Sequence, residues 1–369
     1  MHIRRKCLCR QPECLFWMHS HCNGTANDCD HYAYKHILIT CWKCVDVCAI
    51  PKVNPPSSIQ KDLRPISLTP VVSKVMEEFI YKWVLDIVRP QLHWDQFGAL
   101  QGSSTVDALV YFMHQLYSTT DKAGAHLRAV LVDYQKAFDH LDHKIIITKL
   151  QHLQVPDIIV EWIASFLSGR MQRVKLGNYM SEFVHIKGGV PQGTKLGPLL
   201  FLCMIDDLQV EAPCESLKFV DDTTLLESLP AKDSVSHLQA TLDSLMAWTN
   251  KNNMNLNPSK TKELRINFSK QPLDPTNLLV KQEPVVCVKT AKLLGVTISA
   301  DLKWNCHINN IVKKASQRIY YLTVLKRFGA SSEHLLHVYK TVIRPIVEYA
   351  CQCWHPGLTL SQSRNVPLE

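Results

Sequence analysis

Two apolar stretches that carry aspartates, far apart in the sequence, constrain the fold more than any other feature. Residues 127–133 (LRAVLVD) are short, rich in branched apolar residues and end in a carboxylate, which is typical of a buried strand. Residues 217–226 (LKFVDDTTLL) predict two short strands joined at a turn that carries Asp221 and Asp222. Asp133 can meet this pair only if the two strands are neighbours, so we expect one sheet that contains both.

The sequence around these strands alternates between helical and extended patterns. Helices are expected at residues 73–88, 105–116, 139–153, 156–168, 196–208 and 234–252, and a strand pair at 173–176 with 183–186. These segments together predict a mixed α+β fold.

The composition is that of a folded chain with a basic surface. Hydrophobic residues make up 46% of the 369 residues and charged residues 20%, which is ordinary for two or three globular units. Lysine and arginine outnumber aspartate and glutamate by 41 to 33. This excess favours a polyanionic partner, although a mildly basic surface without one fits as well. No apolar run is long enough for a signal peptide or a membrane span, so we expect an intracellular protein of the nucleus or cytoplasm, not secreted and without a membrane partner.

The cysteines are concentrated at the N-terminus, where eight of the 14 precede Ile50. In a reducing compartment this clustering favours zinc ligation over disulfides. The pattern resembles the second part of a plant-homeodomain (PHD) finger, which implies Zn²⁺ as a cofactor and chromatin or another protein tail as a partner. The candidate zinc ligands are Cys9, Cys14, His19, Cys22, Cys41 and Cys44. The alternative is a truncated finger that binds no metal tightly.

Aspartates that converge at strand ends are suited to divalent cations. Mg²⁺ prefers carboxylate oxygens, and a protein usually supplies only a few of them while phosphates and water complete the octahedron. Asp133, Asp221 and Asp222 would therefore suffice for a two-metal site. An Asp-Asp pair at a turn is also commonly explained by local hydrogen bonding, so the surrounding sequence has to decide between the two interpretations.

Seven strings in a fixed order provide that context. They are RPISLTPVVSKVMEEFI, QFGALQGSSTVDAL, VLVDYQKAFDHLDH, GGVPQGTKLGPLLF, FVDD, LNPSKTK and KLLGVTISADLKW. Together they closely resemble successive motifs of reverse transcriptases from non-LTR (LINE-type) retrotransposons. The resemblance implies an α+β right-hand polymerase fold, with fingers at 51–126, an antiparallel palm sheet in 127–300 and a partial thumb at 301–369. The zinc-finger-like segment 1–50 would precede it, separated by a Pro-rich linker at 51–58.

The resemblance also implies a chemistry. An RNA-directed DNA polymerase transfers nucleotides from dNTPs to the 3′ end of a DNA primer on an RNA template. By this resemblance Asp133 and Asp221 coordinate two Mg²⁺ ions, and Asp222 supports the same hairpin site. Phe138 matches the family's bulky aromatic that excludes ribonucleotides, with core packing as the alternative.

Four further positions are candidates for holding substrate. Gln192 matches a residue near the incoming nucleotide, and Gly193 shapes its loop. Arg64 is suited to the triphosphate or the template by its bidentate guanidinium, although a structural salt bridge explains it equally well. Lys260 or Lys262 lies where some polymerases protonate pyrophosphate, although exposed lysines are commonly only solvated. The basic helical stretch 304–327 would contact the duplex backbone as the start of a thumb.

The sequence also departs from the family. Relatives usually carry an arginine soon after the Phe-Gly pair, where this chain has Ala99, Leu100 and Gln101. The polymerase motifs also begin and end abruptly, so we expect a fragment of a retroelement. Two hypotheses remain. The complete set of carboxylates favours an active reverse transcriptase, whereas the missing arginine and the clipped ends favour an inactive remnant that at most binds nucleic acid or protein.

Overall fold

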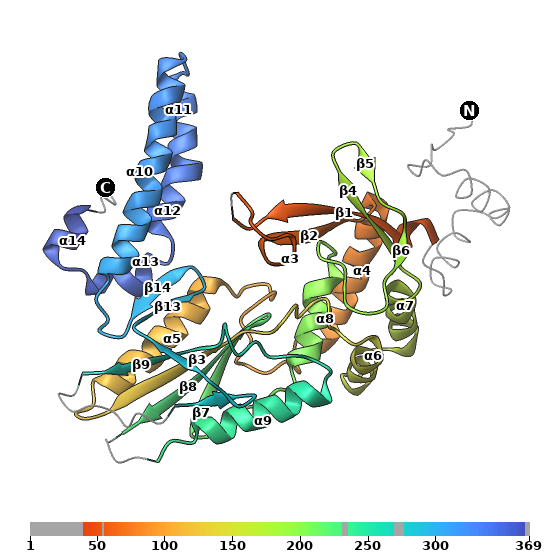
Figure 1. Ribbon diagram of the computed structural model, residues 1–369, viewed down its shortest axis with the longest axis horizontal. Coiled ribbons are helices and arrows are strands. Elements are labelled where there is room, and N and C mark those ends of the chain that lie inside the picture. The colour runs from red at the N-terminus through yellow and green to blue at the C-terminus, as the bar shows by residue number, and fades with distance from the viewer. Residues whose placement is uncertain (1–39, 54, 231–234, 269–276, 366–369) are drawn as a thin grey trace. The chain divides into compact units, whose positions relative to one another are not determined.

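The chain forms two compact units. The computed structural model describes residues 40–53, 55–230, 235–268 and 277–365. The first unit contains the described residues up to 93, together with 135–207 and 250–255; the second contains 94–134, 208–249 and the described residues from 256 onwards. The chain passes between the units several times, so neither is continuous in sequence (Figure 1). No helix in the described ranges is long and apolar enough to cross a membrane.

The first unit contains a five-stranded sheet. Its strands are β1 (Cys44–Pro51), β2 (Leu63–Leu68), β4 (Met171–Leu176), β5 (Tyr179–Met180) and β6 (Val184–His185). β1 is antiparallel to β2 and parallel to β4, and β4 is antiparallel to both β5 and β6. The predicted strand pair is therefore confirmed in β4 and β6.

The candidate zinc ligands fall mostly outside the described part of the chain. Cys9, Cys14, His19 and Cys22 lie outside the described residues, and so does the side chain of Cys41. Cys44 is the first residue of β1 and pairs with Met171 of β4. The last residues of the cysteine-rich segment are thus part of the sheet of the first unit.

The helices of the first unit include α8, which is apolar on all sides. They are η1 (Thr40–Lys43), α3 (Ile59–Asp62), α4 (Val71–Val88), α6 (His143–His152), α7 (Asp157–Leu167) and α8 (Leu196–Ile205). Both α4 and α6 contact α8. The buried Glu77 of α4 accepts a hydrogen bond of 2.7 Å from the Lys195 N–H, which satisfies a backbone donor at the start of α8.

Helix α6 begins later than its apolar pattern predicts. A helix was expected from residue 139, but Asp142 accepts hydrogen bonds from the N–H groups of Lys144 (2.8 Å) and Ile145 (3.2 Å). This aspartate cap fixes the first turn at His143. The residues before it form a turn in which Lys136 has a φ of 47°.

The second unit is built on a five-stranded sheet in the order β12-β9-β3-β8-β7. Its strands are β3 (His126–Val132), β7 (Cys214–Phe219), β8 (Asp222–Leu229), β9 (Lys262–Asn267) and β12 (Val286–Val288), and two small hairpins accompany it, β10 (Leu279–Val280) with β11 (Glu283–Pro284) and β13 (Thr290–Leu293) with β14 (Val296–Ser299). The central strand β3 is antiparallel to both β8 and β9. The expected antiparallel sheet is confirmed in β9, β3, β8 and β7, whereas the edge strand β12 is parallel to β9.

The helices of this unit include three that were predicted, at residues 105–116, 234–252 and 304–327, and further helical segments that were not. They are α5 (Thr105–Thr120), α9 (Leu238–Lys251), α10 (Asn305–Arg327), α11 (Ser332–Val338), the π-helix η2 (Tyr339–Ile343), α12 (Arg344–Glu348), α13 (Cys351–Trp354), η3 (His355–Gly357) and α14 (Leu360–Asn365). Helix α5 begins with a reciprocal capping box between Ser104 and Asp107.

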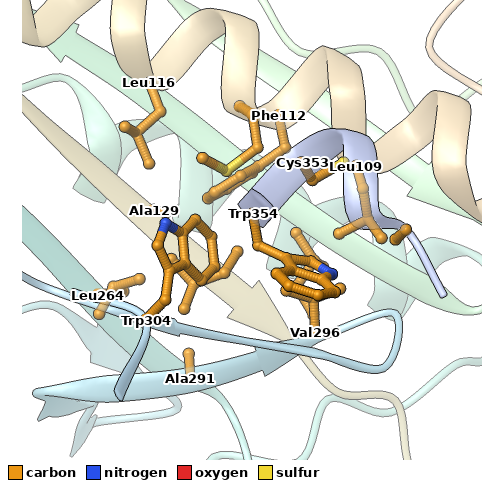
Figure 2. Close-up of a cluster of buried hydrophobic side chains, with 14 of the residues drawn as sticks. Leu109, Phe112, Leu116, Ala129, Leu264, Ala291, Val296, Trp304, Cys353 and Trp354 are labelled. Carbon is orange, nitrogen blue, oxygen red and sulfur yellow. The ribbon is translucent and has the colours of Figure 1, made fainter. Parts of the chain in front are cut away.

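One face of this sheet carries the main apolar core. Leu109, Phe112 and Leu116 of α5 lie over β3, where Leu127 and Ala129 are fully buried. Trp304 and Trp354 lie side by side beneath this helix and close the core toward the β13–β14 hairpin (Figure 2). Because both tryptophans are nearly inaccessible to solvent, the base of α10 is bound into the same core as the sheet.

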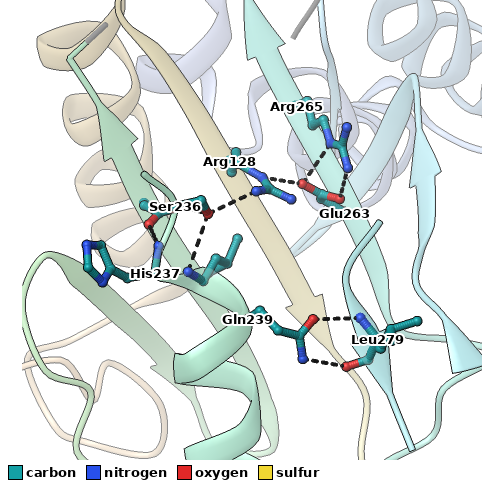
Figure 3. A network of polar contacts seen from close by, with 9 residues as sticks. Arg128, Ser236, His237, Gln239, Glu263, Arg265 and Leu279 are labelled. Carbon is teal, nitrogen blue, oxygen red and sulfur yellow. Dashed lines mark hydrogen bonds and ion pairs between the residues drawn. The ribbon is translucent and has the colours of Figure 1, made fainter. Parts of the chain in front are cut away.

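A polar network lies among β3, β9 and the segment before α9 (Figure 3). Arg128 of β3 donates to Glu263 of β9 at 2.7 Å and to Ser236 at 2.9 Å. Arg265 also donates to Glu263 (2.8 Å). Since these groups are largely buried and paired, they hold the start of α9 against the sheet.

The base of α10 contains a buried histidine between the two tryptophans. The ring of His307 lies 6.2 Å from Trp304 and 5.3 Å from Trp354, centroid to centroid, and its Nδ1 accepts the Thr297 N–H at 3.3 Å. Burial lowers the pKa of His307 from 6.5 to about 4, and the charge of Lys314 acts in the same direction. The neutral ring is therefore the form that fits the core.

The stability of the second unit should consequently fall in mild acid. The unfolded chain protonates His307 below about pH 6.5, whereas the folded chain protonates it only near pH 4. The contribution of the neutral ring to the free energy of unfolding is therefore fully present above pH 6.5 and is lost as the pH falls toward 4. The loss is roughly 3 kcal/mol at most. Urea unfolding at pH 7 and pH 4.5 of wild type and His307→Gln is expected to show a steeper loss in wild type. Equal losses would contradict this prediction.

Candidate active site

Asp133 follows directly on the end of the central strand β3. In the β3–β8 pair, Val132 lies opposite Thr223, so Asp133 comes after β3 next to the point where β8 begins with Asp222. The requirement that the two strands be neighbours in one sheet is met. The pairing brings the first predicted carboxylate to the same edge of the sheet as the other two.

The hairpin between β7 and β8 carries the remaining two aspartates. Phe219 pairs with Asp222, so Val220 and Asp221 form the two-residue turn. Val220 has a φ of 59°, a left-handed conformation that β-branched residues rarely adopt. Both acids were predicted in the turn, but Asp222 is the first residue of β8 and only Asp221 occupies the turn.

The carboxylates disfavour one another's charge. The Asp221 and Asp222 side chains are accessible to solvent, but the surrounding protein removes part of their water. This desolvation, followed by the charges of Asp221 and Asp133, raises the pKa of Asp222 to about 6. Desolvation and then the charge of Asp133 likewise raise the pKa of Asp221. A nearby divalent cation would relieve this repulsion.

Asp133 is held by the segment that precedes β9. Its backbone carbonyl accepts the Asn257 N–H at 2.8 Å, and its N–H donates to Thr261 Oγ1 at 3.4 Å. Its buried Oδ2 accepts no hydrogen bond from any described residue, and the exposed Lys260 ammonium lies 3.8 Å from this oxygen. The contribution of Asn257 and Thr261 was missed, although two polar residues close to the start of a strand are a usable signal.

No metal cluster is fully formed among these side chains. Among the described residues, no group of three or more histidine, cysteine, aspartate or glutamate side chains is placed to hold a metal ion. The unsatisfied Asp133 oxygen and the raised pKa values of the other two acids nevertheless fit a hard divalent cation, because carboxylate oxygens are the ligands that such ions prefer.

The other candidate residues belong to the first unit. Three of them, Phe138, Gln192 and Gly193, lie close together. Phe138 stacks on Phe201 of α8 with ring centroids 5.1 Å apart, and its carbonyl accepts the Val190 N–H at 2.8 Å. The Gln192 side chain reaches Asp139 at 3.5 Å. Phe138 is therefore packed against the same loop that carries Gln192.

Gly193 and Arg64 are connected to that loop through β2. The Gln192 carbonyl accepts the Ser67 N–H at 2.7 Å. Gly193 has a φ of 109°, and a Cβ there would lie 2.9 Å from the Ser67 carbonyl oxygen, so only glycine fits. Arg64 is exposed on β2, paired with Ile50. Asp133, Asp221, Asp222 and Lys260 lie in the second unit.

Comparison with known proteins assigns this arrangement to a family. The family model described as "Reverse transcriptase (RNA-dependent DNA polymerase)" matches residues 50–298. The chain belongs to this reverse transcriptase family. The matched range contains residues of both units and all three aspartates.

Curated relatives of this chain come from mobile elements. It is 30% identical over 340 residues to the probable RNA-directed DNA polymerase from transposon BS of Drosophila melanogaster, covering 88% of this chain and 37% of the relative. It is 25% identical over 326 residues to the RNA-directed DNA polymerase from mobile element jockey of the same species, covering 85% and 35%. The chain thus spans little more than a third of these relatives.

Solved structures agree on the fold. Telomerase from Candida tropicalis, determined in complex with a TWJ fragment of telomeric RNA, matches with a TM-score of 0.50 at 14% identity, covering 93% of this chain and 58% of that chain. The apo telomerase from the same species gives the same score, covering 89% and 60%. These likenesses support a polymerase fold for this chain.

Replacing one of the repelling acids should stabilise the protein when divalent cations are removed. Asp222→Asn removes a charge that desolvation and two neighbouring carboxylates oppose. Because solvent screens this accessible site, the gain in unfolding free energy at pH 8 should not exceed about 1 kcal/mol. Urea unfolding in a chelator would measure it, with Asp86→Asn on the exposed side of α4 as control. A loss of stability in Asp222→Asn would contradict the prediction.

Proposed function

We propose that this chain is the polymerase part of a non-LTR retrotransposon protein and joins dNTPs to the 3′ end of a DNA primer on an RNA template. The observation that carries the proposal is the register of β3 on β8, which brings Asp133 to the edge of the sheet where Asp222 begins β8. Membership of the reverse transcriptase family and the relation to retrotransposon polymerases support it.

Mg²⁺ is the proposed cofactor. Asp133 and Asp221 would hold two Mg²⁺ ions, with Asp222 as a supporting carboxylate. When bound, the ions would lower the pKa of the primer hydroxyl and neutralise charge on the attacked phosphate and the departing pyrophosphate. The unsatisfied Asp133 Oδ2 and the neighbouring carboxylates of raised pKa support this assignment.

The substrate-binding residues have distinct proposed roles. Phe138, fixed by its stacking on Phe201, would exclude the 2′-hydroxyl of ribonucleotides, and Gln192 would contact the incoming nucleotide from the loop shaped by Gly193. Arg64, exposed on β2, would bind a phosphate. Lys260 lies beside Asp133 and would donate a proton to the leaving pyrophosphate.

The proposed nucleic-acid surface includes helix α10. Its exposed basic residues are Lys313, Lys314, Arg318, Lys326 and Arg327. Such charges bind the phosphate backbone without reading its sequence, which suits a polymerase that must move along its template. We further propose that the protein acts on nucleic acids in the nucleus or cytoplasm. Residues 1–50 would bind a chromatin or protein tail in a zinc-dependent manner.

A remnant that binds nucleic acid without extending it is the second candidate. The observation in its favour is the sequence Ala99, Leu100 and Gln101 where related enzymes carry an arginine. Loss of a guanidinium from a triphosphate site would lower turnover while leaving duplex binding intact.

Primer extension separates the two candidates. With an RNA template, a DNA primer, dNTPs and Mg²⁺, wild type is expected to extend the primer. Asp221→Ala is expected to extend it at least about 1,000-fold more slowly, because a metal ligand is removed. Asp86→Asn serves as the matched control and should retain the wild-type rate. If wild type extends no better than Asp221→Ala, the chain is a remnant.

Binding to a labelled primer–template should depend on α10 in either case. Lys313→Ala removes one exposed positive charge, so the slope of log affinity against log salt is expected to fall by about one. The weakening should be the same for unrelated sequences. Lys122→Ala, in the turn after α5, should leave the slope unchanged in the same filter-binding assay, and an equal effect of both variants would contradict a role for α10.

A further inference from the structure

The segment Asp95–Gly98 pairs with the strand that leads into the acidic turn. The Lys218 N–H donates to the Asp95 carbonyl at 2.9 Å, and the Phe97 N–H donates to the Lys218 carbonyl at 2.8 Å. Gln96 thus lies beside Lys218 in a short parallel bridge. Residues 96–98 belong to one of the seven strings that resemble the family's motifs, but the sequence predicts no contact for them, because their importance depends on this long-range pairing.

A buried ion pair anchors the segment. The Lys218 ammonium lies 3.2 Å from Asp95 Oδ2, and both side chains are 1% exposed. Lys218 also donates to the Leu208 carbonyl, and Ser216 donates to Asp95. Because each charge has a further hydrogen-bond partner, the pair fixes the segment against β7.

The side chain of Gln96 reaches beyond this anchor to the turn. Its Oε1 accepts the Val220 N–H at 3.2 Å and the Gly98 N–H at 2.9 Å. Val220 is the residue whose φ of 59° is unfavourable for a β-branched side chain. Gln96 is 6% exposed, so its carbonyl oxygen takes the place of water as the acceptor for this backbone group.

Gly98 lies in direct contact with the same turn. A Cβ at this position would be 2.5 Å from the Val220 nitrogen and 2.8 Å from the Phe219 carbonyl carbon. Both contacts are with backbone, which cannot move aside as the end of a side chain can. The absence of a side chain at Gly98 therefore allows the segment to lie against the turn.

We propose that Gln96 and Gly98 are positioning residues for the proposed polymerase reaction: they hold Val220 in its left-handed conformation and thereby fix Asp221 and Asp222 at the start of β8, beside Asp133. The inference rests on the proposed function, since it gives these residues a part in catalysis. Neither residue touches substrate. Their effect passes through the backbone of Val220.

Hydrogen–deuterium exchange of the full chain tests the contact without relying on activity. Gln96→Met keeps the length of the side chain but removes the acceptor, so the Val220 amide is expected to exchange at least about tenfold faster. Gly98→Ala should have the same effect by displacing the turn. Gln239→Met is the matched control, because Gln239 also makes two hydrogen bonds to one backbone, that of Leu279 (3.1 and 2.8 Å; Figure 3). Unchanged exchange at Val220 in Gln96→Met would overturn the proposal.

A double-mutant cycle tests the catalytic part. Gln96→Met should lower kcat for primer extension about tenfold and raise the Mg²⁺ concentration for half-maximal rate, with little change in KM for primer–template. Glycine at position 220 adopts the left-handed conformation without strain. In the Val220→Gly background, Gln96→Met should therefore lower kcat much less than it does in wild type. An equal loss of kcat in both backgrounds would overturn the proposal. Absence of extension already in wild type rejects the proposed function, and the exchange measurement then decides the positioning of the turn by itself.

Discussion

The antiparallel pairing of β3 with β8 is the interaction on which the acidic site depends. Side chains of a strand alternate between two faces, so a slip of one residue would place Leu127 and Ala129 on the wrong face of the sheet and move Asp133 with them. Both residues are completely buried beneath α5, which makes such a slip costly. The position of the first carboxylate is thus determined by apolar residues that take no part in chemistry.

The elements of this fold with a strong apolar pattern could be predicted from the sequence. The apolar run of β3 and the amphipathic spacing of α4 and α5 reflect burial that any fold of this chain would need. The residue at which an element begins was harder to predict, because a single polar contact decides it. The Asp142 cap moves the start of α6 to His143, and no periodicity signals which aspartate of a helical stretch will act as the cap.

The candidate site was predicted in its acids and not in the residues that hold them. Asp133, Asp221 and Asp222 could be singled out because few residue types serve a divalent cation. Gln96 acquires its role only when Asp95–Gly98 pairs with Lys218, and that pairing leaves no local pattern. The same contact explains why the turn differs from the prediction. Local preference disfavours Val220 in a left-handed conformation, whereas the Gln96 acceptor and the space at Gly98 favour it.

The hairpin combines two unfavourable features, a strained residue and mutually repelling carboxylates. A non-glycine residue in the left-handed region costs roughly 1–3 kcal/mol, and the turn would relax if its neighbours were free to move. They are not free, because the buried Lys218–Asp95 pair ties β7 to the segment that carries Gln96. Removing either charge would leave the other buried and unpaired, which is more costly than the strain itself. The strain therefore persists at Val220, next to the acids whose positions it determines, because the ion pair fixes the neighbouring backbone while the tryptophan core of the same unit provides apolar burial.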